Sequence, residues 1–123
     1  MKIFLFAILM AITFSAQAAN PWLVKKIVFC ESSGQHLTKS GRFHCGDDGV
    51  SCGIAQFREE TFYEFAAQSI RDRTWPFKRP YWFSKSQQMF LLRWGLDHGY
   101  GKRWTCYRKI MAQLRNPMDS DHN

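Results

Sequence analysis

Four cysteines constrain the possible folds of this chain more than any other feature of its sequence. They follow a segment, residues 1–18, with the pattern of a secretory signal: Lys2, an apolar run over residues 3–14, and Ala16-Gln17-Ala18 as a cleavage site. An even number of cysteines in a short exported chain predicts disulfides. We therefore expect cleavage after Ala18 and a small domain with two disulfides, either periplasmic or secreted.

The cysteines are Cys30, Cys45, Cys52 and Cys106. Their positions do not decide the pairing, since four cysteines allow three pairings. We expect Cys30–Cys106, which would tie the first helix of the domain to the last, and Cys45–Cys52, which would close a short loop. A zinc site of the two loop cysteines with His36 and His44 is the alternative, but the spacing of these cysteines is unusual for zinc. We expect no metal and no cofactor.

The rest of the chain is expected to form one domain, residues 19–117, followed by a disordered tail at 118–123. The apolar run of the signal is too short to span a bilayer. We therefore expect no integral membrane association once the signal is removed, with an uncleaved N-terminal anchor as the alternative. The net charge is +7, and loss of Lys2 with the signal leaves +6. A basic exported protein suits an anionic polymer, and charge alone does not separate wall glycan with peptide carboxylates, anionic lipid and nucleic acid.

Hydrophobic periodicity predicts an α+β domain that is predominantly α-helical, with a small loop or hairpin region at 35–52. The first helix is expected from Pro21 to Glu31, with Gly34 as its terminator. The second helix is expected to follow Glu59 and Glu60. Its buried face would consist of Phe62, Phe65, Ala66 and Ser69.

Two further helices are expected after the irregular segment 71–83. Ser84 and Gln87 form a capping-box pattern at the start of the third helix, and Gly99 is its expected end. Phe90, Leu91 and Trp94 would face inward from this helix. The apolar positions expected on the fourth helix are Trp104, Tyr107, Ile110, Met111 and Leu114.

Glu31 ends the first predicted helix, where the helix dipole favours cations rather than anions. The dipole and apolar neighbours both disfavour the ionised form, so we expect a raised pKa for Glu31. An acid that keeps its proton near neutral pH is suited to protonate the leaving oxygen of a glycoside. A solvated glutamate at a frayed helix end is the alternative.

Two short motifs are spaced about twenty residues apart: Glu31-Ser32-Ser33-Gly34 at a helix end, and Gly53-Ile54-Ala55-Gln56 after the loop. A glycine-bearing turn (Gly99 to Gly101) and Trp104 with Cys106 follow. With these features the chain resembles the small lytic transglycosylases of the lysozyme-like superfamily. The resemblance covers residues 24–107 and implies a lysozyme-like domain.

The resemblance implies cleavage of the β-1,4 bond between N-acetylmuramic acid and N-acetylglucosamine in peptidoglycan glycan strands. Glu31 would protonate the glycosidic oxygen and then accept the proton of the muramoyl 6-hydroxyl, which gives a 1,6-anhydromuramoyl end. Such an enzyme could open the wall locally for a secretion, conjugation or phage apparatus. Nucleic acid is not expected as a partner.

The resemblance to the lytic transglycosylases also implies roles for three further residues. Gln56 corresponds to a glutamine beside the catalytic acid, and a buried amide that closes loop backbone groups is an equal alternative. Ser33 would hold Glu31 or a sugar, although a helix-end hydroxyl bonded to backbone is slightly favoured. Tyr100 could supply the hydroxyl that faces the acid in larger relatives, but its offset from their motif does not match.

Other residues offer rival functions. Asp47 or Asp48 could serve as a second carboxylate in a muramidase that uses water, but Asp-Gly favours a solvated turn. His36 and His98 could be general bases, although packing or surface roles are favoured. A non-catalytic exported module that binds wall glycan is the alternative outside enzymes.

The segment between the second and third predicted helices is rich in aromatic residues. Trp75, Tyr81 and Trp82 could line a sugar groove, since sugar faces stack on aromatic rings. In so small a domain such residues more often belong to the core, and we favour the core for them.

Overall fold

The computed structural model describes residues 19–116. The expected signal peptide at 1–18, the domain end at 117 and the expected tail at 118–123 lie outside the described residues. The elements are α2 (Pro21–Ser32), β1 (Ser51–Cys52), β2 (Phe57–Arg58), α3 (Glu59–Arg71), α4 (Lys85–Asp97), the 3-10 turn η2 (Gly101–Arg103) and α5 (Thr105–Arg115). Four α-helices and two short strands in this range confirm the helix-rich fold with a small hairpin.

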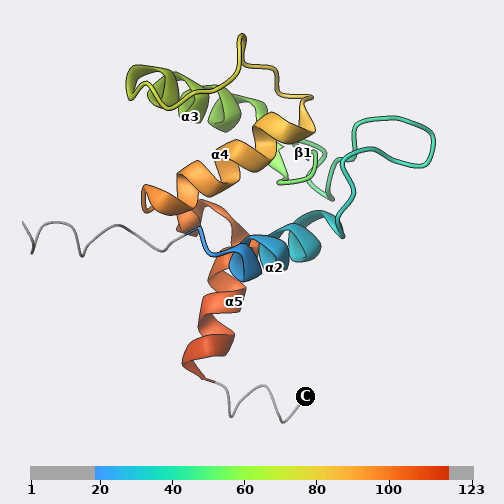
Figure 1. Cartoon of the computed structure of the whole chain (residues 1–123). Coiled ribbons are helices and arrows are strands. Elements are labelled where there is room, and N and C mark those ends of the chain that lie inside the picture. The colour runs from blue at the N-terminus through green and yellow to red at the C-terminus, as the bar shows by residue number, and fades with distance from the viewer. Residues whose placement is uncertain (1–18, 117–123) are drawn as a thin grey trace, which may run out of the picture.

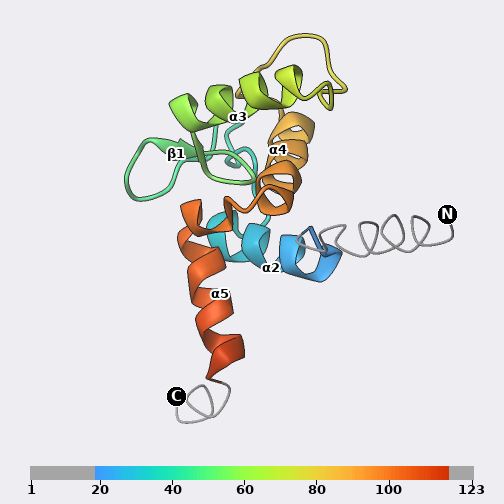
Figure 2. The same cartoon turned by 90° about the vertical axis from the view of Figure 1, so that its left-hand side faces the viewer.

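The helices are arranged in two pairs. Figure 1 shows α3 beside α4 in one half of the molecule and α2 beside α5 in the other, and Figure 2 shows the same arrangement after a quarter turn. The outer end of α5 extends away from the other helices in both views. The core fills the space between the pairs, and its largest fully buried hydrophobic side chains are Ile27, Phe57, Phe62, Phe65, Leu91 and Leu92.

Helix α2 begins and ends as its sequence predicts. The side chain of Asn20 accepts a hydrogen bond from the backbone N–H of Trp22 at 2.8 Å, and Pro21 occupies the first helical position. Ser33 and Gly34 both have positive φ, so the chain leaves the helix through a left-handed turn. Glu31 therefore lies in the last turn of α2.

Helix α3 buries the face expected for it, whereas α4 buries Leu91 and Trp94 but Phe90 only partly, and its start also differs from the prediction. Phe62, Phe65, Ala66 and Ser69 are all buried in α3. Ser84 Oγ accepts a hydrogen bond from the N–H of Gln87 at 3.2 Å, which is half of the predicted capping box. The Gln87 side chain does not complete the box, because it bonds Tyr81 N and Arg79 O in the irregular segment instead.

Helix α5 is only partly packed. Trp104, just before its first residue, and Ile110 are buried, and Tyr107 and Met111 are partly buried. Leu114 was predicted to face inward, but 55% of it is exposed. The expectation fails because the outer end of α5 extends past the other helices, and within residues 19–116 no other helix lies beside it there.

A small antiparallel hairpin connects the two halves of the fold. Ser51 pairs with Arg58 and Cys52 with Phe57, and isolated bridges join Leu37 to Phe43 and Cys45 to Cys52. The region 35–52 is thus a loop with local hairpin pairing, as predicted.

Both expected disulfides are present: Cys30–Cys106 links α2 to α5, and Cys45–Cys52 closes the loop. Their sulfur atoms cannot act as thiolate ligands, so the alternative zinc site is wrong. Two disulfides are typical of an oxidising compartment. Over residues 19–116, no helix has the length and apolar character needed to cross a membrane.

Candidate active site

Glu31 is held between two helix ends. Its side chain is partly buried, and Oε1 accepts a hydrogen bond from the backbone N–H of Cys106 at 3.1 Å. Cys106 lies in the first turn of α5 and is tied by its disulfide to Cys30, the neighbour of Glu31. The carboxyl group therefore lies at the negative end of α2 and at the positive end of α5.

These surroundings act on the proton of Glu31 in opposite directions. Burial is the largest influence and raises the pKa of Glu31 above its usual value. The Cys106 N–H and the positive charges of Lys109 and Arg108 lower it, and the charge of Asp48 raises it. The net result is a raised pKa, as expected, with burial as the main cause.

The hydrogen bond between Glu31 and Cys106 also caps the start of helix α5. The N-cap residue of α5, Trp104, provides no side-chain hydrogen bond to the first turn of the helix. Glu31 supplies an acceptor there from another element, as a capping side chain would. Because Oε1 makes this contact, Oε2 is the oxygen on which a proton can be carried and transferred.

Ser32 attaches this helix end to the second motif. Its hydroxyl oxygen lies 2.8 Å from the carbonyl oxygen of Ile54 and 3.0 Å from that of Val28, and the residue is 2% exposed. The sequence interpretation considered Ser33 and missed Ser32. A serine four residues after a helical carbonyl was the available signal, since such hydroxyls often bond back to it.

Gln88 of α4 holds the second motif from the opposite side and was also missed. Its Oε1 accepts from Ala55 N at 3.0 Å, and its Nε2 donates to Cys52 O at 3.1 Å and to Trp82 O at 2.9 Å. A Cβ at Gly53 would collide with this amide, so glycine is required there for space as well as for its φ of 88°. The signal was a polar residue on the same helix face as Leu91 and Leu92.

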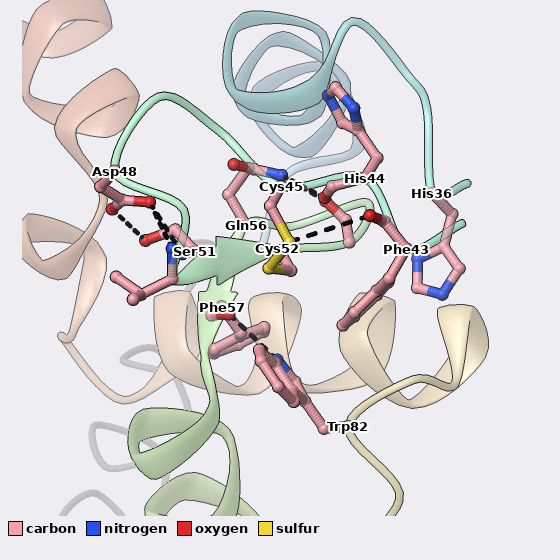
Figure 3. Close-up of a disulfide and its surroundings, with 12 residues drawn as sticks. His36, Phe43, His44, Cys45, Asp48, Ser51, Cys52, Gln56, Phe57 and Trp82 are labelled. Carbon is pink, nitrogen blue, oxygen red and sulfur yellow. Dashed lines mark hydrogen bonds between the residues drawn. A yellow bond between two sulfur atoms is a disulfide. The ribbon is translucent and has the colours of Figure 1, made fainter. Parts of the chain in front are cut away.

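Gln56 uses its amide to close the loop. Its Nε2 donates to Gly53 O at 2.9 Å and to His44 O at 3.1 Å, and its Oε1 lies against Gly46, where a Cβ would be only 2.6 Å away. Figure 3 shows the Gln56 amide beside the Cys45–Cys52 disulfide and directed at His44. This arrangement matches the structural interpretation of Gln56. A role toward a substrate stays a prediction.

Ser33 and Tyr100 lie in different places. Ser33 is exposed at the left-handed end of α2, where its N–H donates to Phe29 O. The Tyr100 hydroxyl donates to Gln68 Oε1 at 3.2 Å, and its ring stacks on Phe65 of α3 with centroids 5.1 Å apart. The Tyr100 hydroxyl thus already bonds α3, and contact of Ser33 or Tyr100 with a sugar stays a prediction.

Asp48 is an exposed carboxylate that stabilises the loop through hydrogen bonds to Val50 and Ser51. Its oxygens accept from Val50 N and Ser51 N, both at 2.9 Å, and from Ser51 Oγ at 2.7 Å, as Figure 3 shows in part. These hydrogen bonds lower the pKa of Asp48. Its negative charge nevertheless contributes to the raised pKa of Glu31, so the two carboxyl groups lie close enough to interact. Asp47 beside it is exposed.

The histidines proposed as general bases are engaged with backbone. His36 Nδ1 accepts from Ile54 N at 2.9 Å, so Nε2 carries the proton that is donated to Phe83 O. His98 bonds Trp94 O through Nδ1, and its ring stacks on Trp94 at 4.1 Å. Both residues match the favoured packing roles.

The aromatic residues of the irregular segment divide into two groups. Trp75 and Trp82 pack against the core, and the Trp82 indole N–H donates to Phe57 O at 3.0 Å. Tyr81 is exposed. The core interpretation therefore holds for both tryptophans and not for Tyr81.

A cavity of about 280 Å³ opens between the hairpin, the start of α3 and the turn that leads into α5. Glu31 does not line it, but the wall residue Trp104 lies two positions before Cys106, and the wall residue Ser51 holds Asp48. The residues that line it are Ser51, Gln56, Phe57, Arg58, Thr61, Arg103 and Trp104. The wall of the cavity is thus connected to the start of α5 and to the loop that holds Asp48.

Residues 19–116 contain no group of three or more histidine, cysteine, aspartate or glutamate side chains placed to hold a metal ion. A scan against protein-family models, a search of curated proteins and a search of solved structures each found no match.

Proposed function

We propose that this protein is a lytic transglycosylase with a lysozyme-like domain, which cleaves the β-1,4 bond between N-acetylmuramic acid and N-acetylglucosamine in peptidoglycan. The observation that carries the proposal is the environment of Glu31: a partly buried acid with a raised pKa at a helix end, in contact with the first turn of α5. A single acid whose pKa is raised in this way is suited to protonate a glycosidic oxygen.

The surroundings of Glu31 suit both halves of the proposed reaction. Burial favours the protonated acid, from whose Oε2 the leaving oxygen takes its proton. The Cys106 N–H and the charges of Lys109 and Arg108 then stabilise the carboxylate. As a carboxylate, Glu31 accepts the proton of the muramoyl 6-hydroxyl while that oxygen attacks the anomeric carbon. The acid is restored, and no water is consumed.

Mass spectrometry of the products from purified sacculi tests this proposal. We expect muropeptides that end in 1,6-anhydromuramic acid, each lighter by one water than the corresponding reducing-end product. The Glu31→Gln variant provides the control for contaminating activity and should release neither kind. Reducing ends as the main product of the wild type would contradict the transglycosylase mechanism.

A hydrolytic muramidase is the second candidate, and the interaction between Glu31 and Asp48 favours it. The pKa of Glu31 is raised and that of Asp48 is lowered, which is how an acid and a carboxylate partner divide their roles in glycosidases. In that case the products would have reducing ends, and Asp48→Asn would abolish their release. We favour the transglycosylase because the three contacts of Asp48 with Val50 and Ser51 give it a structural task in the loop.

A binding module without catalysis is the candidate outside enzymes. It would bind wall glycan through its positive charge, leave the turbidity of wall suspensions unchanged and be indifferent to Glu31→Gln. We propose an enzyme because a binding module gains nothing from an acid with a raised pKa. The small size of the proposed enzyme suits local opening of the wall for a secretion, conjugation or phage apparatus.

A further inference from the structure

The cavity between the hairpin, the start of α3 and the turn before α5 has a positively charged wall. Two of its seven lining residues are arginines, Arg58 and Arg103, and none of them is acidic. Glu59 and Glu60 follow Arg58 in the chain but do not line the cavity. Such a wall favours an anionic group over a neutral sugar alone.

Arg103 already has its partners within the fold. Its guanidinium lies 3.3 Å and 3.4 Å from the carboxylate oxygens of Glu64 and is placed over the ring of Phe65 at 5.6 Å. The ion pair largely neutralises its charge, and the ring contact helps to fix its position. Arg103 is therefore a fixed part of the cavity wall, and its charge is already paired with that of Glu64.

Arg58 differs from Arg103 in having no such partner. It is exposed at the end of β2, where the chain enters α3, and within residues 19–116 its side chain has no hydrogen bond or ion pair. Its positive charge helps to lower the pKa of Asp48, so Arg58 acts on the loop that holds this carboxylate. Arg58 is thus an available guanidinium in the wall of the cavity.

We propose that this cavity binds a carboxylate of the peptide that branches from the sugar strand, and that Arg58 is the residue that recognises it. The inference rests on the proposed function and names which form of the substrate the site selects. A guanidinium binds a carboxylate through two parallel hydrogen bonds, which a neutral glycan cannot offer. The protein then prefers strands that carry peptides with free carboxylates over strands without peptides.

The test compares two substrates that differ only in their peptides: intact glycan strands from sacculi, and the same strands stripped of peptide by an amidase. Arg58→Gln should lower kcat/KM on intact strands roughly tenfold, mainly through KM, because a charge-assisted pair at a half-open site is lost. On stripped strands it should leave kcat/KM unchanged. Arg58→Lys should recover part of the loss, since lysine keeps the charge but not the two-pronged geometry.

Arg42→Gln is the matched control, because Arg42 is an exposed arginine of the loop that does not line the cavity. It should leave both substrates unaffected. An equal loss on both substrates, or no loss on intact strands at equal thermal stability of Arg58→Gln, would overturn the assignment of Arg58. The proposed function would fail separately, if the wild type produced no anhydro ends from either substrate.

Discussion

At the scale of single residues, the central feature is a carboxyl group placed between opposing influences. The last turn of α2 and burial favour the protonated form of Glu31, while the first turn of α5 and two nearby cations favour the carboxylate. This balance allows one group to donate a proton and then accept one. The sequence predicted the first influence from the position of Glu31 in its own helix. The second depends on α5, which lies 75 residues away in the chain.

The charges around Glu31 predict how the pH profile of the proposed activity responds to substitution. The free enzyme needs protonated Glu31, so kcat/KM on sacculi should fall as pH rises through its raised pKa. Asp48→Asn removes a charge that raises this pKa and should move the alkaline limb to lower pH. Lys109→Gln removes a charge that lowers it and should move the limb to higher pH.

Both substitutions are exposed, and asparagine retains an oxygen that can accept the hydrogen bonds of Val50 N and Ser51 N. The measurement is the pH dependence of kcat/KM for the wild type and the two variants. Shifts in the same direction for both variants would mean that Glu31 does not set the alkaline limb.

At the scale of elements, local patterns in the chain predicted most of the structure. Asn20 and Pro21 start α2, the apolar face of α3 is buried as its spacing indicates, and Ser84 caps α4. Those signals act within one or two turns of helix. The contacts of Ser32 and Gln88 with the second motif join residues 22 to 36 positions apart, and no local pattern specifies such partners.

Substitution of two glycines in the hairpin region tests how tightly α4 holds the second motif. Gly49 and Gly53 both have positive φ, but a Cβ at Gly49 meets open space and one at Gly53 meets the Gln88 amide. Gly49→Ala should lower the free energy of unfolding by about 1–2 kcal/mol, the cost of the left-handed conformation. Gly53→Ala should cost a further 1–3 kcal/mol or so, because the side chain has no room.

Chemical denaturation of the two variants measures this difference. Because Gly53 lies between the loop and Gln56, its substitution should also reduce the clearing of sacculi, whereas Gly49→Ala should not. Equal costs for the two glycines would mean that the Gln88 contact does not restrict this part of the hairpin.

At the scale of the whole molecule, a domain of about a hundred residues has a small core and depends on its disulfides. Cys30–Cys106 spans 76 residues and Cys45–Cys52 spans 7. Loop-closure entropy predicts a cost of roughly 4–5 kcal/mol for replacing the first pair with serine and roughly 2–3 kcal/mol for the second. Unfolding in denaturant measures both, and a larger loss from the short loop would contradict the entropic account.

The sequence predicted the helix-rich class, both disulfides and the raised pKa of Glu31 at the end of the first helix. It did not predict that α5 extends past the core, which leaves Leu114 exposed, because periodicity marks an apolar face without showing whether another element covers it. It could not specify the cavity either, since that space is enclosed by three elements that meet only in the folded molecule.

The central claim is that the proton of Glu31 performs the chemistry. Glutamine at this position retains an oxygen that can accept the Cys106 N–H, so the contact with α5 survives while the acid is lost. The raised pKa gives folded Glu31 a stabilising contribution that is present at low pH and is lost as pH rises through that pKa. Glutamine does not ionise, so Glu31→Gln should be at least as stable as the wild type at neutral pH.

The most direct test is the clearing of purified sacculi by Glu31→Gln at neutral pH, with thermal unfolding of the same samples. We predict a loss of at least about a hundredfold in the rate of clearing, the usual scale for an essential acid, with no decrease in melting temperature. Clearing at the wild-type rate by the folded variant would contradict the account and leave Glu31 as a structural cap of α5.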